Sequence, residues 1–540
     1  MHPLALIAFA WAVPAQQPVL EATLTAPAPT QNESFGAGLD LDGDWALCSS
    51  NATVQGVPNA GLVYVYRALG SAWSLDAILL PPDPQVDRKF GWLGLEYEDD
   101  FIYVATPSGT ADLSLSGKVH VYQRNAGAWQ HVAELVASQA ADAQSYATGL
   151  AVQGDTVAVV ASTPSASVYV YRRQGLQWVE EARLDPPSPT LSYRCIDLDG
   201  DRLVVASLGN GSASYPGAAW VYRRQGSTWN LEATLTSGNP NPTRYFGEAV
   251  AIDGDVIACN AVELGLPPSQ SRGEVSLFEF AAGAWNEVGR VQAPTASYAF
   301  NFGGRIALHD DRLLIADETY RQSPSSPTIG AVWQFQRTGP SWASIGAALL
   351  LPTPSPTSSE SYGYTLDASL GRAIGGSTSS VVAGQGGAGL VHIHKLGAPV
   401  ETICEAAPAA CFGQLSTAGA PSASVNTPFS ISLSGAQGQR NALFFYGVSG
   451  RTAQPWRVGG GVLCVQPPVQ RTPVQLTGGT LNVCDGSAQL DWNAYQATHL
   501  GALGQPWSAG DRVQLQAWLR NPAASSATVV SATIEFLLQP

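Results

Sequence analysis

A unit of about fifty residues recurs seven times along this chain, and this repetition restricts its possible folds more than any other feature. The clearest copy opens as FGEAVAIDGDVIACN at Phe246, where Asp253-Gly254 between two apolar runs is the strongest short-range signal for a tight β-hairpin. EVSLFEF from Glu274 alternates as a third strand, and WNEVGRV from Trp285 is expected to form a fourth. A sheet of four short strands cannot bury its faces alone, so the copies must pack against one another.

The other copies share an opening made of an aromatic residue, an apolar strand and, in most of them, an acidic turn. Most copies also close with a glycine that stands two or three residues before a tryptophan, as Gly226 stands before Trp229. Glycine allows the positive φ that such a turn needs, and each tryptophan can cap one sheet against its neighbour. The other copies begin at Phe35, Phe90, Tyr146, Tyr193, Phe302 and Tyr362.

The seventh copy stops early, and the chain holds the missing strand at its other end. LVHIHKLG from Leu390 is followed by no tryptophan and no fourth strand. LEATLT at Leu20 to Thr25 is identical to LEATLT at Leu231 to Thr236, the fourth strand of the fourth copy. We therefore expect an all-β fold in which residues 16–398 form a seven-bladed β-propeller closed by the N-terminal strand, an arrangement that removes exposed sheet edges.

A second, smaller domain follows the repeats. PFSISLS from Pro428 and RVQLQAWLR from Arg512 alternate as strands without the repeat pattern, which predicts a β-sandwich over residues 426–540. Residues 399–425 are rich in small side chains and are expected to be a linker that carries a cysteine pair. The chain is long enough for both domains to have cores of their own.

Four of the seven cysteines fall after the repeats, which makes two disulfides plausible if the chain is exported. The pairing is not deducible from the sequence, and the simplest one joins Cys404 to Cys411 and Cys464 to Cys484. Equivalent positions in separate blades are too far apart to form a disulfide, so the other three cysteines are expected to be buried thiols. These are Cys48, Cys195 and Cys259.

The start of the chain resembles a secretory signal. The apolar run from Leu4 to Val13 is too short to span a bilayer, and small residues at Val13 and Ala15 suit cleavage after Ala15, so residues 1–15 are expected to be a signal peptide. No other run approaches a membrane span, and we expect a secreted, cell-surface or periplasmic monomer. The net charge of -15 and the pI near 4.8 argue against a nucleic-acid partner.

The repeat resembles the FG-GAP repeat family. Phe-Gly, an apolar strand, Asp-Gly-Asp, a second strand, Val-Tyr-Val-Tyr and a Gly-x-x-Trp turn recur over about Val19 to Gly397. That family includes the seven-bladed head of integrin α subunits and many bacterial exported proteins, so the resemblance implies a propeller used for extracellular binding or adhesion. GGGVLCVQPP from Gly459 is similar to a C-terminal module of bacterial exported proteins.

The resemblance also implies calcium, because integrin-type blades bind it through runs of alternating aspartates. Two turns here, LDLDGD and IDLDGD, supply three alternate carboxylates each, although they lack the last aspartate of the family's loop and depart from its spacing. The alternative is a hairpin turn whose flanking carboxylates face water. The candidate calcium ligands are Asp40, Asp42, Asp44, Asp197, Asp199 and Asp201.

Other candidate sites are weaker. His392 and His394 share one face of a strand and offer two nitrogens to a metal, but they occupy the slots of Tyr64 and Tyr66 in the first copy, which favours aromatic packing. No local motif for nucleophilic or acid-base catalysis is present. Charged residues in or beside loops that could line one face are Asp87, Arg88, Lys89, Asp112, Arg272, Glu318 and Arg321.

These patterns predict an exported, non-enzymatic protein that binds an extracellular protein or glycan through propeller loops. The first alternative is a polysaccharide-active hydrolase or lyase at the central pocket, which a cluster of carboxylates at one mouth of the channel would favour. A broad apolar or aromatic loop surface would favour binding instead. A structural envelope component is the second alternative.

Overall fold

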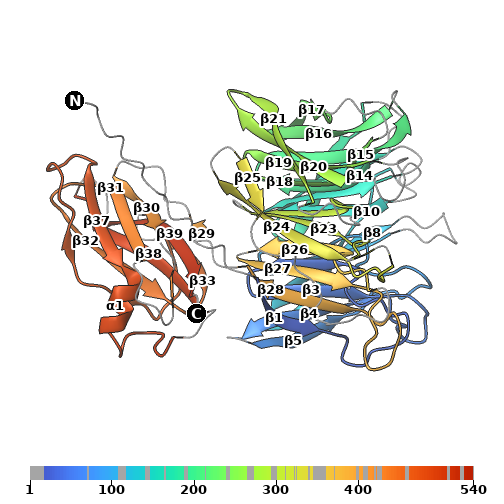
Figure 1. The fold of residues 1–540 in the computed structure, drawn as a ribbon, viewed down its shortest axis with the longest axis horizontal. Coiled ribbons are helices and arrows are strands. Elements are labelled where there is room, and N and C mark those ends of the chain that lie inside the picture. The colour runs from blue at the N-terminus through green and yellow to red at the C-terminus, as the bar shows by residue number, and fades with distance from the viewer. Residues whose placement is uncertain are drawn as a thin grey trace. The chain divides into compact units, whose positions relative to one another are not determined.

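Antiparallel sheets dominate this all-β protein (Figure 1). The chain divides into two compact units after His394. The computed structural model describes residues 18–69, 72–107, 117–139, 146–162, 166–187, 193–212, 215–238, 244–263, 273–293, 301–309, 312–321, 323, 325–338, 341–344, 360–369, 371–396, 401–404, 411–418, 421–422, 429–455, 461–507, 511–522 and 528–538.

Seven four-stranded antiparallel sheets form the first unit, and we number them in chain order. Sheet 1 contains β2 (Leu39–Asp42), β3 (Trp45–Ser50), β4 (Leu62–Leu69) and β5 (Ala72–Leu79), and sheet 2 contains β6 (Leu95–Glu98), β7 (Phe101–Thr106), β8 (Lys118–Asn125) and β9 (Ala128–Leu135). Sheet 3 contains β10 (Tyr146–Gln153), β11 (Thr156–Ala161), β12 (Ser167–Gln174) and β13 (Gln177–Leu184), and sheet 4 contains β14 (Tyr193–Asp199), β15 (Arg202–Ser212), β16 (Tyr215–Gln225) and β17 (Thr228–Leu235). Sheet 5 contains β18 (Arg244–Asp253), β19 (Val256–Glu263), β20 (Gly273–Ala281) and β21 (Ala284–Gln292), and sheet 6 contains β22 (Arg305–His309), β23 (Arg312–Asp317), β24 (Ala331–Thr338) and β25 (Ser341–Ser344). Sheet 7 contains β26 (Thr365–Ser369), β27 (Arg372–Ser377), β28 (Leu390–Lys395) and β1 (Val19–Leu24).

Sheet 7 is completed by the N-terminal strand. Its strand order is β1-β28-β27-β26, which confirms the expectation that the N-terminal segment supplies the missing fourth strand. The first strand of each sheet contacts the first strand of the next sheet along the chain, and β26 contacts β2. In Figure 1 the last sheet accordingly lies beside the first. These repeated sheets are consistent with a β-propeller.

The aromatic residue that opens each repeat is a core residue in every copy. Each packs on an aromatic ring of its own sheet, as Phe35 packs on Tyr64 with ring centroids 5.4 Å apart. The glycine after it, Gly36, has a φ of 85°, and a Cβ there would come within 2.5 Å of Val391 Cγ2. The seven rings, each at most 1% exposed, are Phe35, Phe90, Tyr146, Tyr193, Phe246, Phe302 and Tyr362.

Tryptophans near the start of the fourth strands bind the neighbouring sheet, as the repeats predicted. The indole N–H of Trp129 donates to Asp76 Oδ2 of the preceding sheet at 3.1 Å. Trp229 donates to Glu181 Oε1 at 3.1 Å in the same way. These bonds join the outer strands of consecutive sheets, so the tryptophan contributes a polar contact as well as apolar area.

The second unit contains two larger sheets, a two-stranded sheet and a short helix. The six-stranded sheet contains β29 (Glu401–Cys404), β39 (Thr528–Leu537), β38 (Arg512–Arg520), β32 (Asn441–Gly447), β35 (Gln470–Arg471) and β36 (Gln475–Leu476). The three-stranded sheet contains β30 (Phe412–Ala418), β31 (Ser430–Ala436) and β37 (Gly486–Asp491). The remaining elements are β33 (Arg451–Pro455), β34 (Val462–Val465) and α1 (Trp492–Thr498).

The larger of two hydrophobic clusters described in the second unit receives side chains from both larger sheets. Ile431 of the three-stranded sheet, Phe444 and Leu515 of the six-stranded sheet and Trp492 of α1 are fully buried in this cluster. The expectation that residues 399–425 are only a linker is wrong, because β29 and β30 lie within them and pair with β39 and β31. The many small residues in this segment weaken the apolar-polar alternation by which these two short strands could have been predicted.

A disulfide joins Cys411 to Cys484, with Cα atoms 4.9 Å apart. The simplest pairing, Cys404 with Cys411 and Cys464 with Cys484, is therefore wrong. The fold brings the start of β30 close to the segment before β37 because both strands flank β31. The thiols of Cys48 and Cys259 are fully buried, as expected, whereas Cys195 is partly exposed. Within the described residues, no helix is long and apolar enough to cross a membrane.

Candidate functional site

The first strands of three sheets carry acidic side chains two residues apart, and the first strand of sheet 7 carries one acid, Asp367, at the matching place. Residues two apart in a strand point to the same side, and the first strands contact one another, so these carboxyls gather in one region. The strands are β2, β6, β14 and β26, and the carboxyls are Asp40, Asp42, Glu96, Glu98, Asp197, Asp199 and Asp367.

Most of these carboxyls accept hydrogen bonds from the backbone of the next sheet. Leu41 N–H donates to Asp367 Oδ2 at 2.7 Å, and Tyr97 N–H donates to Asp40 Oδ2 at 2.9 Å. Both acceptors occupy the same place in their repeats, and the two bonds join sheet 7 to sheet 1 and sheet 1 to sheet 2.

Two hydrogen bonds of the same kind join sheets 4 and 5. Ile252 N–H donates to Asp197 Oδ2 at 2.7 Å, and Gly254 N–H donates to Asp199 Oδ2 at 2.7 Å. In sheet 2, Glu98 Oε1 accepts from Gly154 N–H at 2.6 Å. A first strand is the edge of its own sheet, so these bonds satisfy N–H groups that no strand pairs.

Burial and mutual repulsion favour the neutral form of these acids. Burial, followed by the charges of Asp367 and Asp42, raises the pKa of Asp40 well above its usual range. Burial raises the pKa of Asp197 to about 7 and that of Asp367 to about 6, with backbone hydrogen bonds acting in the opposite direction. The interpretation in which these turn carboxylates face water is wrong for Asp40, which is 8% exposed.

The candidate calcium ligands have different partners within each turn. Asp44 pairs with Arg372 Nη1 at 3.2 Å, and Asp201 pairs with Arg223 Nε at 3.0 Å. Asp42 Oδ1 lies 3.5 Å from Ser369 Oγ. Asp40 and Asp197, from separate sheets, both act on the carboxyl of Glu96 and so belong to one acidic cluster.

Glu96 is the exception among the acids of the first strands. Burial, followed by the charges of Asp40 and Asp367, raises its pKa well above the usual range. Within the described part of the chain its carboxyl accepts no hydrogen bond, whereas the equivalent Asp40 and Asp197 do. Among the described residues of this cluster, Glu96 is therefore a carboxyl that does not hydrogen-bond one sheet to the next.

His392 and His394 occupy the aromatic slots of sheet 7. Their rings lie 5.8 and 6.2 Å from that of Tyr362, and His392 Nδ1 lies 2.9 Å from Thr23 Oγ1 of β1. Burial lowers the pKa of each to about 4. The packing interpretation of this pair is confirmed.

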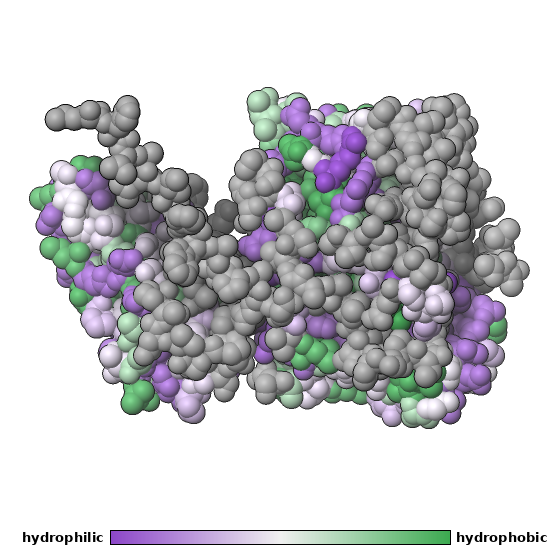
Figure 2. Space-filling view, in the orientation of Figure 1, coloured by the Kyte–Doolittle hydropathy of each residue, from purple (hydrophilic) through white to green (hydrophobic). Residues whose placement is uncertain are grey.

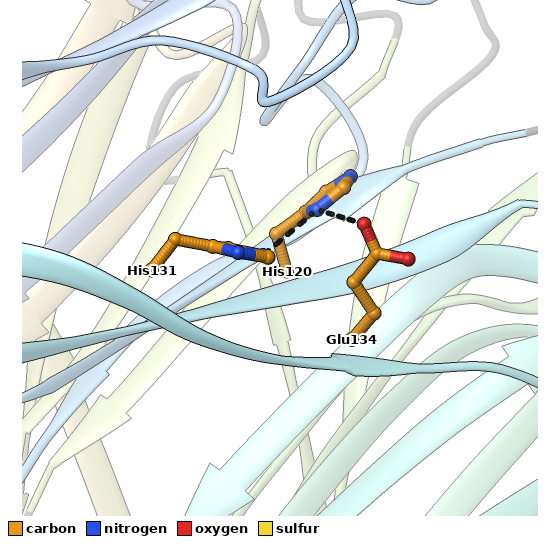
Figure 3. Close-up of side chains that lie close together, drawn as sticks. All are labelled: His120, His131 and Glu134. Carbon is orange, nitrogen blue, oxygen red and sulfur yellow. Dashed lines mark hydrogen bonds and ion pairs between the residues drawn. The ribbon is translucent and has the colours of Figure 1, made fainter.

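A different histidine cluster lies on the outer strands of sheet 2 (Figure 3). His120 of β8 stands between His131 and Glu134 of β9, with His120 Nδ1 3.4 Å from His131 Nε2 and 3.4 Å from Glu134 Oε1. All three could offer a ligand atom to one metal ion. The repeat patterns did not predict this cluster, although the sequence carries a signal for it: His-x-x-Glu in a fourth strand, opposite a histidine in the third.

The five charged loop residues that the structure describes do not converge on one site. Arg88 Nη1 donates to Pro107 O at 2.9 Å, and Lys89 Nζ lies 3.6 Å from the ring centroid of Trp92. Glu318 Oε1 accepts from Asn301 Nδ2, and Arg321 Nε donates to Thr328 Oγ1. Asp87 Oδ1 accepts from Asn59 Nδ2 at 2.8 Å. Two further candidates lie outside the described residues, Asp112 and Arg272.

No protein-family model and no curated protein matches this chain. Among solved structures, a chain in the crystal structure of the mitotic checkpoint complex is similar over 73% of this chain and 98% of its own length, at 12% identity and a TM-score of 0.42. A "putative 6-phosphogluconolactonase" from Bacteroides uniformis is similar over 61% of this chain and 88% of its own length, at 12% identity and a TM-score of 0.40. Neither likeness extends to function.

Proposed function

We propose that the first unit is a closed seven-bladed β-propeller of the FG-GAP type and that the second is a β-sandwich. The cyclic contacts of the first strands and the bonds from sheet 7 to sheet 1 support closure. The shared core of the two larger sheets supports the sandwich. In this proposal the chain is exported through a signal peptide at residues 1–15 and acts as a non-enzymatic binding or adhesion protein outside the cell.

The observation that carries the proposal is a braced loop surface at one end of sheets 7, 1 and 2. We define it as residues 25–38, 51–61, 80–94 and 378–389. These segments enter a first strand or join a second strand to a third, so they lie at the same end of their sheets (Figure 1). A protein or glycan bound there would meet several blades at once.

Backbone hydrogen bonds run across the braced loop surface from segment to segment. Asn32 N–H donates to Gly386 O at 2.9 Å, and Asn51 N–H donates to Glu33 O at 2.7 Å. Lys89 N–H continues the series by donating to Asn59 O at 3.1 Å. Loops held in this way lose little conformational entropy when a partner binds, which favours affinity.

Exposed apolar and aromatic side chains lie on the braced loop surface. Val86 is 59% exposed, Val381 51% and Leu93 40%, and the ring of Trp92 carries the Lys89 ammonium over its face. On the face drawn in Figure 2, hydrophilic and hydrophobic residues are intermixed over the coloured atoms, so the exposure of single residues is the guide. Aromatic and aliphatic side chains of this kind are typical anchors for proteins and sugar rings.

The acidic cluster favours a second candidate, a polysaccharide-active hydrolase or lyase. Clustered carboxyls with raised pKa values suit acid-base chemistry, and glycoside hydrolysis uses two of them. Asp40, Asp197 and Asp367, however, already accept backbone hydrogen bonds between sheets. Because that role leaves Glu96 as the one carboxyl of the four without such a bond, binding remains the better supported function.

Binding to glycan and extracellular-protein arrays tests the proposal. We expect the V86D variant to bind its array partner roughly tenfold or more weakly, because a charge would be desolvated in the contact. The matched control is L176D, since Leu176 is 55% exposed in a turn between third and fourth strands, at the other end of its sheet. Equal binding by wild type and V86D would contradict the proposal.

Two further measurements separate the alternatives. Release of reducing sugar from a polysaccharide by wild type but not by E96Q would establish the hydrolase instead. A melt with and without millimolar calcium after chelation tests whether the Asp-Gly turns hold the ion, because a ligand bound only to the native state raises its melting temperature.

A further inference from the structure

The register between β8 and β9 places three ligating side chains on one face of sheet 2. His120 is paired with Glu134, and Tyr122 is paired with His131. Residues three apart normally point to opposite sides of a strand, but a register shift between Val121 and Tyr122 inserts one extra residue in β9. The bulge therefore returns His131 to the face that Glu134 and His120 occupy.

We propose that His120, His131 and Glu134 form a zinc site with one coordination position open. In a tetrahedral site with ligand bonds of about 2.0–2.1 Å, two ligand atoms lie about 3.3–3.4 Å apart. The two distances from His120 Nδ1, to His131 Nε2 and to Glu134 Oε1, are both 3.4 Å. The three ligand atoms all lie within 4.8 Å of one another, so a small closing movement completes the triangle.

The charge states of the three groups suit metal binding at neutral pH. Burial lowers the pKa of His120 to about 4, and it lowers the pKa of His131 as well, so both imidazoles have a free lone pair. Partial burial acts to raise the pKa of Glu134, but the pKa is lowered overall, and the hydrogen bond from the Lys118 ammonium is the largest of the lowering effects. Lys118 Nζ holds Oε2 at 2.6 Å, and this contact leaves Oε1 directed at His120.

The donor set selects the metal. Two imidazoles and one carboxylate match the ligands of three-residue zinc sites, which keep a fourth position for water or an incoming group. Calcium and magnesium prefer oxygen ligands only. His131 and Glu134 are exposed, so an ion can enter from solvent.

The positions equivalent to His120, His131 and Glu134 in other sheets show whether the fold requires ligating residues at these places. The same register shift recurs in sheets 1, 3, 4 and 5, but in none of these four sheets do the three positions hold a histidine or three metal-ligating side chains. In sheet 5, for example, Glu287 pairs with Arg290 at 2.6 Å. The three positions are filled by Tyr64, Leu75 and Ile78, by Tyr169, Glu180 and Arg183, by Trp220, Leu231 and Thr234, and by Ser276, Glu287 and Arg290.

Zinc titration of the untagged chain from Gln16, freed of metal by chelation, tests the site by calorimetry. We expect one zinc ion per chain, a higher melting temperature in zinc, and visible absorption of four-coordinate cobalt when cobalt replaces it. His131→Ala and Glu134→Gln should each weaken zinc binding by roughly tenfold or more, since even loss of an outer partner of a ligand costs that much. Both side chains are exposed, so both variants should fold.

The matched control is His499→Ala, because His499 stacks on Tyr495 of α1 and is remote from sheet 2 in the sequence. It should bind zinc as wild type does. Absence of zinc binding by wild type, or unchanged binding by both His131→Ala and Glu134→Gln, would overturn the proposal. Zinc binding that survives in those variants and is lost in Cys195→Ser would also overturn it.

Discussion

Replacement of Arg372 by methionine should open the first unit at the place where its two ends meet. Arg372 starts β27 in sheet 7, and its guanidinium binds Glu21 of the N-terminal strand through Nε at 2.8 Å and Nη2 at 2.9 Å. Its Nη1 donates to Gly43 O of sheet 1 at 3.1 Å. One side chain therefore joins β27 both to the N-terminal strand β1 of the same sheet and to sheet 1.

The expected magnitude follows from burial. The side chains of Arg372 and Glu21 are each 3% exposed. Removal of one partner from a buried, hydrogen-bonded ion pair leaves the other charge unpaired and costs about 3–5 kcal/mol. For a cooperative unit of roughly 380 residues, that loss lowers the melting temperature by about 4–6 °C.

The matched control is Arg202→Met in sheet 4. Arg202 likewise binds a glutamate of the fourth strand, Glu232 at 3.1 Å, and an acid of the next sheet, Asp255 at 2.8 Å. Each of the two guanidinium groups also lies over a tryptophan ring, at 5.3 Å for Arg372 and 5.2 Å for Arg202. Arg202 and Glu232 are more exposed, at 10% and 16%. In addition β17 is joined to β16 by a short turn, whereas β1 is held in sheet 7 without a chain connection to its partner β28. We expect a smaller fall in melting temperature for Arg202→Met.

Hydrogen exchange distinguishes local opening from general destabilisation. In Arg372→Met the amides of β1 and β28 should exchange much faster, while those of sheet 4 should keep their protection. In Arg202→Met the protection of β1 should be unchanged. A melting temperature within one degree of wild type (about 1 kcal/mol by the same conversion), together with full protection of β1, would refute the view that this ion pair closes the unit.

Two further changes test the acidic cluster and the disulfide. Burial raises the pKa of Asp197 to about 7, so the folded state keeps a proton that the unfolded chain releases above about pH 4. Relative to Asp197→Asn, the wild-type free energy of unfolding should therefore fall between pH 5 and pH 7 by up to about 1.4 kcal/mol per pH unit. Urea unfolding at several pH values measures it, and the same dependence of the unfolding free energy on pH in both proteins would contradict the prediction. Replacement of both Cys411 and Cys484 by serine opens a loop with a sequence separation of 73 and should destabilise the second unit by about 4 kcal/mol, seen as a separate calorimetric transition; an unchanged transition would show that the bridge is dispensable.

Comparison between repeat copies predicted the parts of the fold that recur. The identity of LEATLT at the N-terminus and in the fourth strand of sheet 4 placed the N-terminal segment in sheet 7, and the contacts explain the identity. Glu21 and Glu232 in these segments each bind an arginine that starts the second strand of the same sheet. The aromatic residue of each Phe-Gly opening was likewise found by repetition, because every copy needs a ring at that core position.

Features that depend on contacts between copies were not visible in the sequence. Asp40 looks like a turn residue in its own repeat, and only the neighbouring first strands bury it and give it the amide of Tyr97. The disulfide between Cys411 and Cys484 depends on the order of strands in the second unit, where no repeat offers a comparison. Local patterns predict which element a residue occupies, whereas its burial and partners depend on how distant elements meet.

The histidine cluster of sheet 2 combines a geometry that recurs between repeats with residues that do not recur. A β-bulge at the same point of sheets 1 to 5 gathers three side chains on one face, so the geometry belongs to the fold. The chemistry depends only on which residues occupy those positions, and sheet 2 alone among these five has three metal-ligating groups there. Because exchange of exposed side chains at such positions costs the core little, a repeat protein can gain or lose a metal site in one copy without any change in its fold.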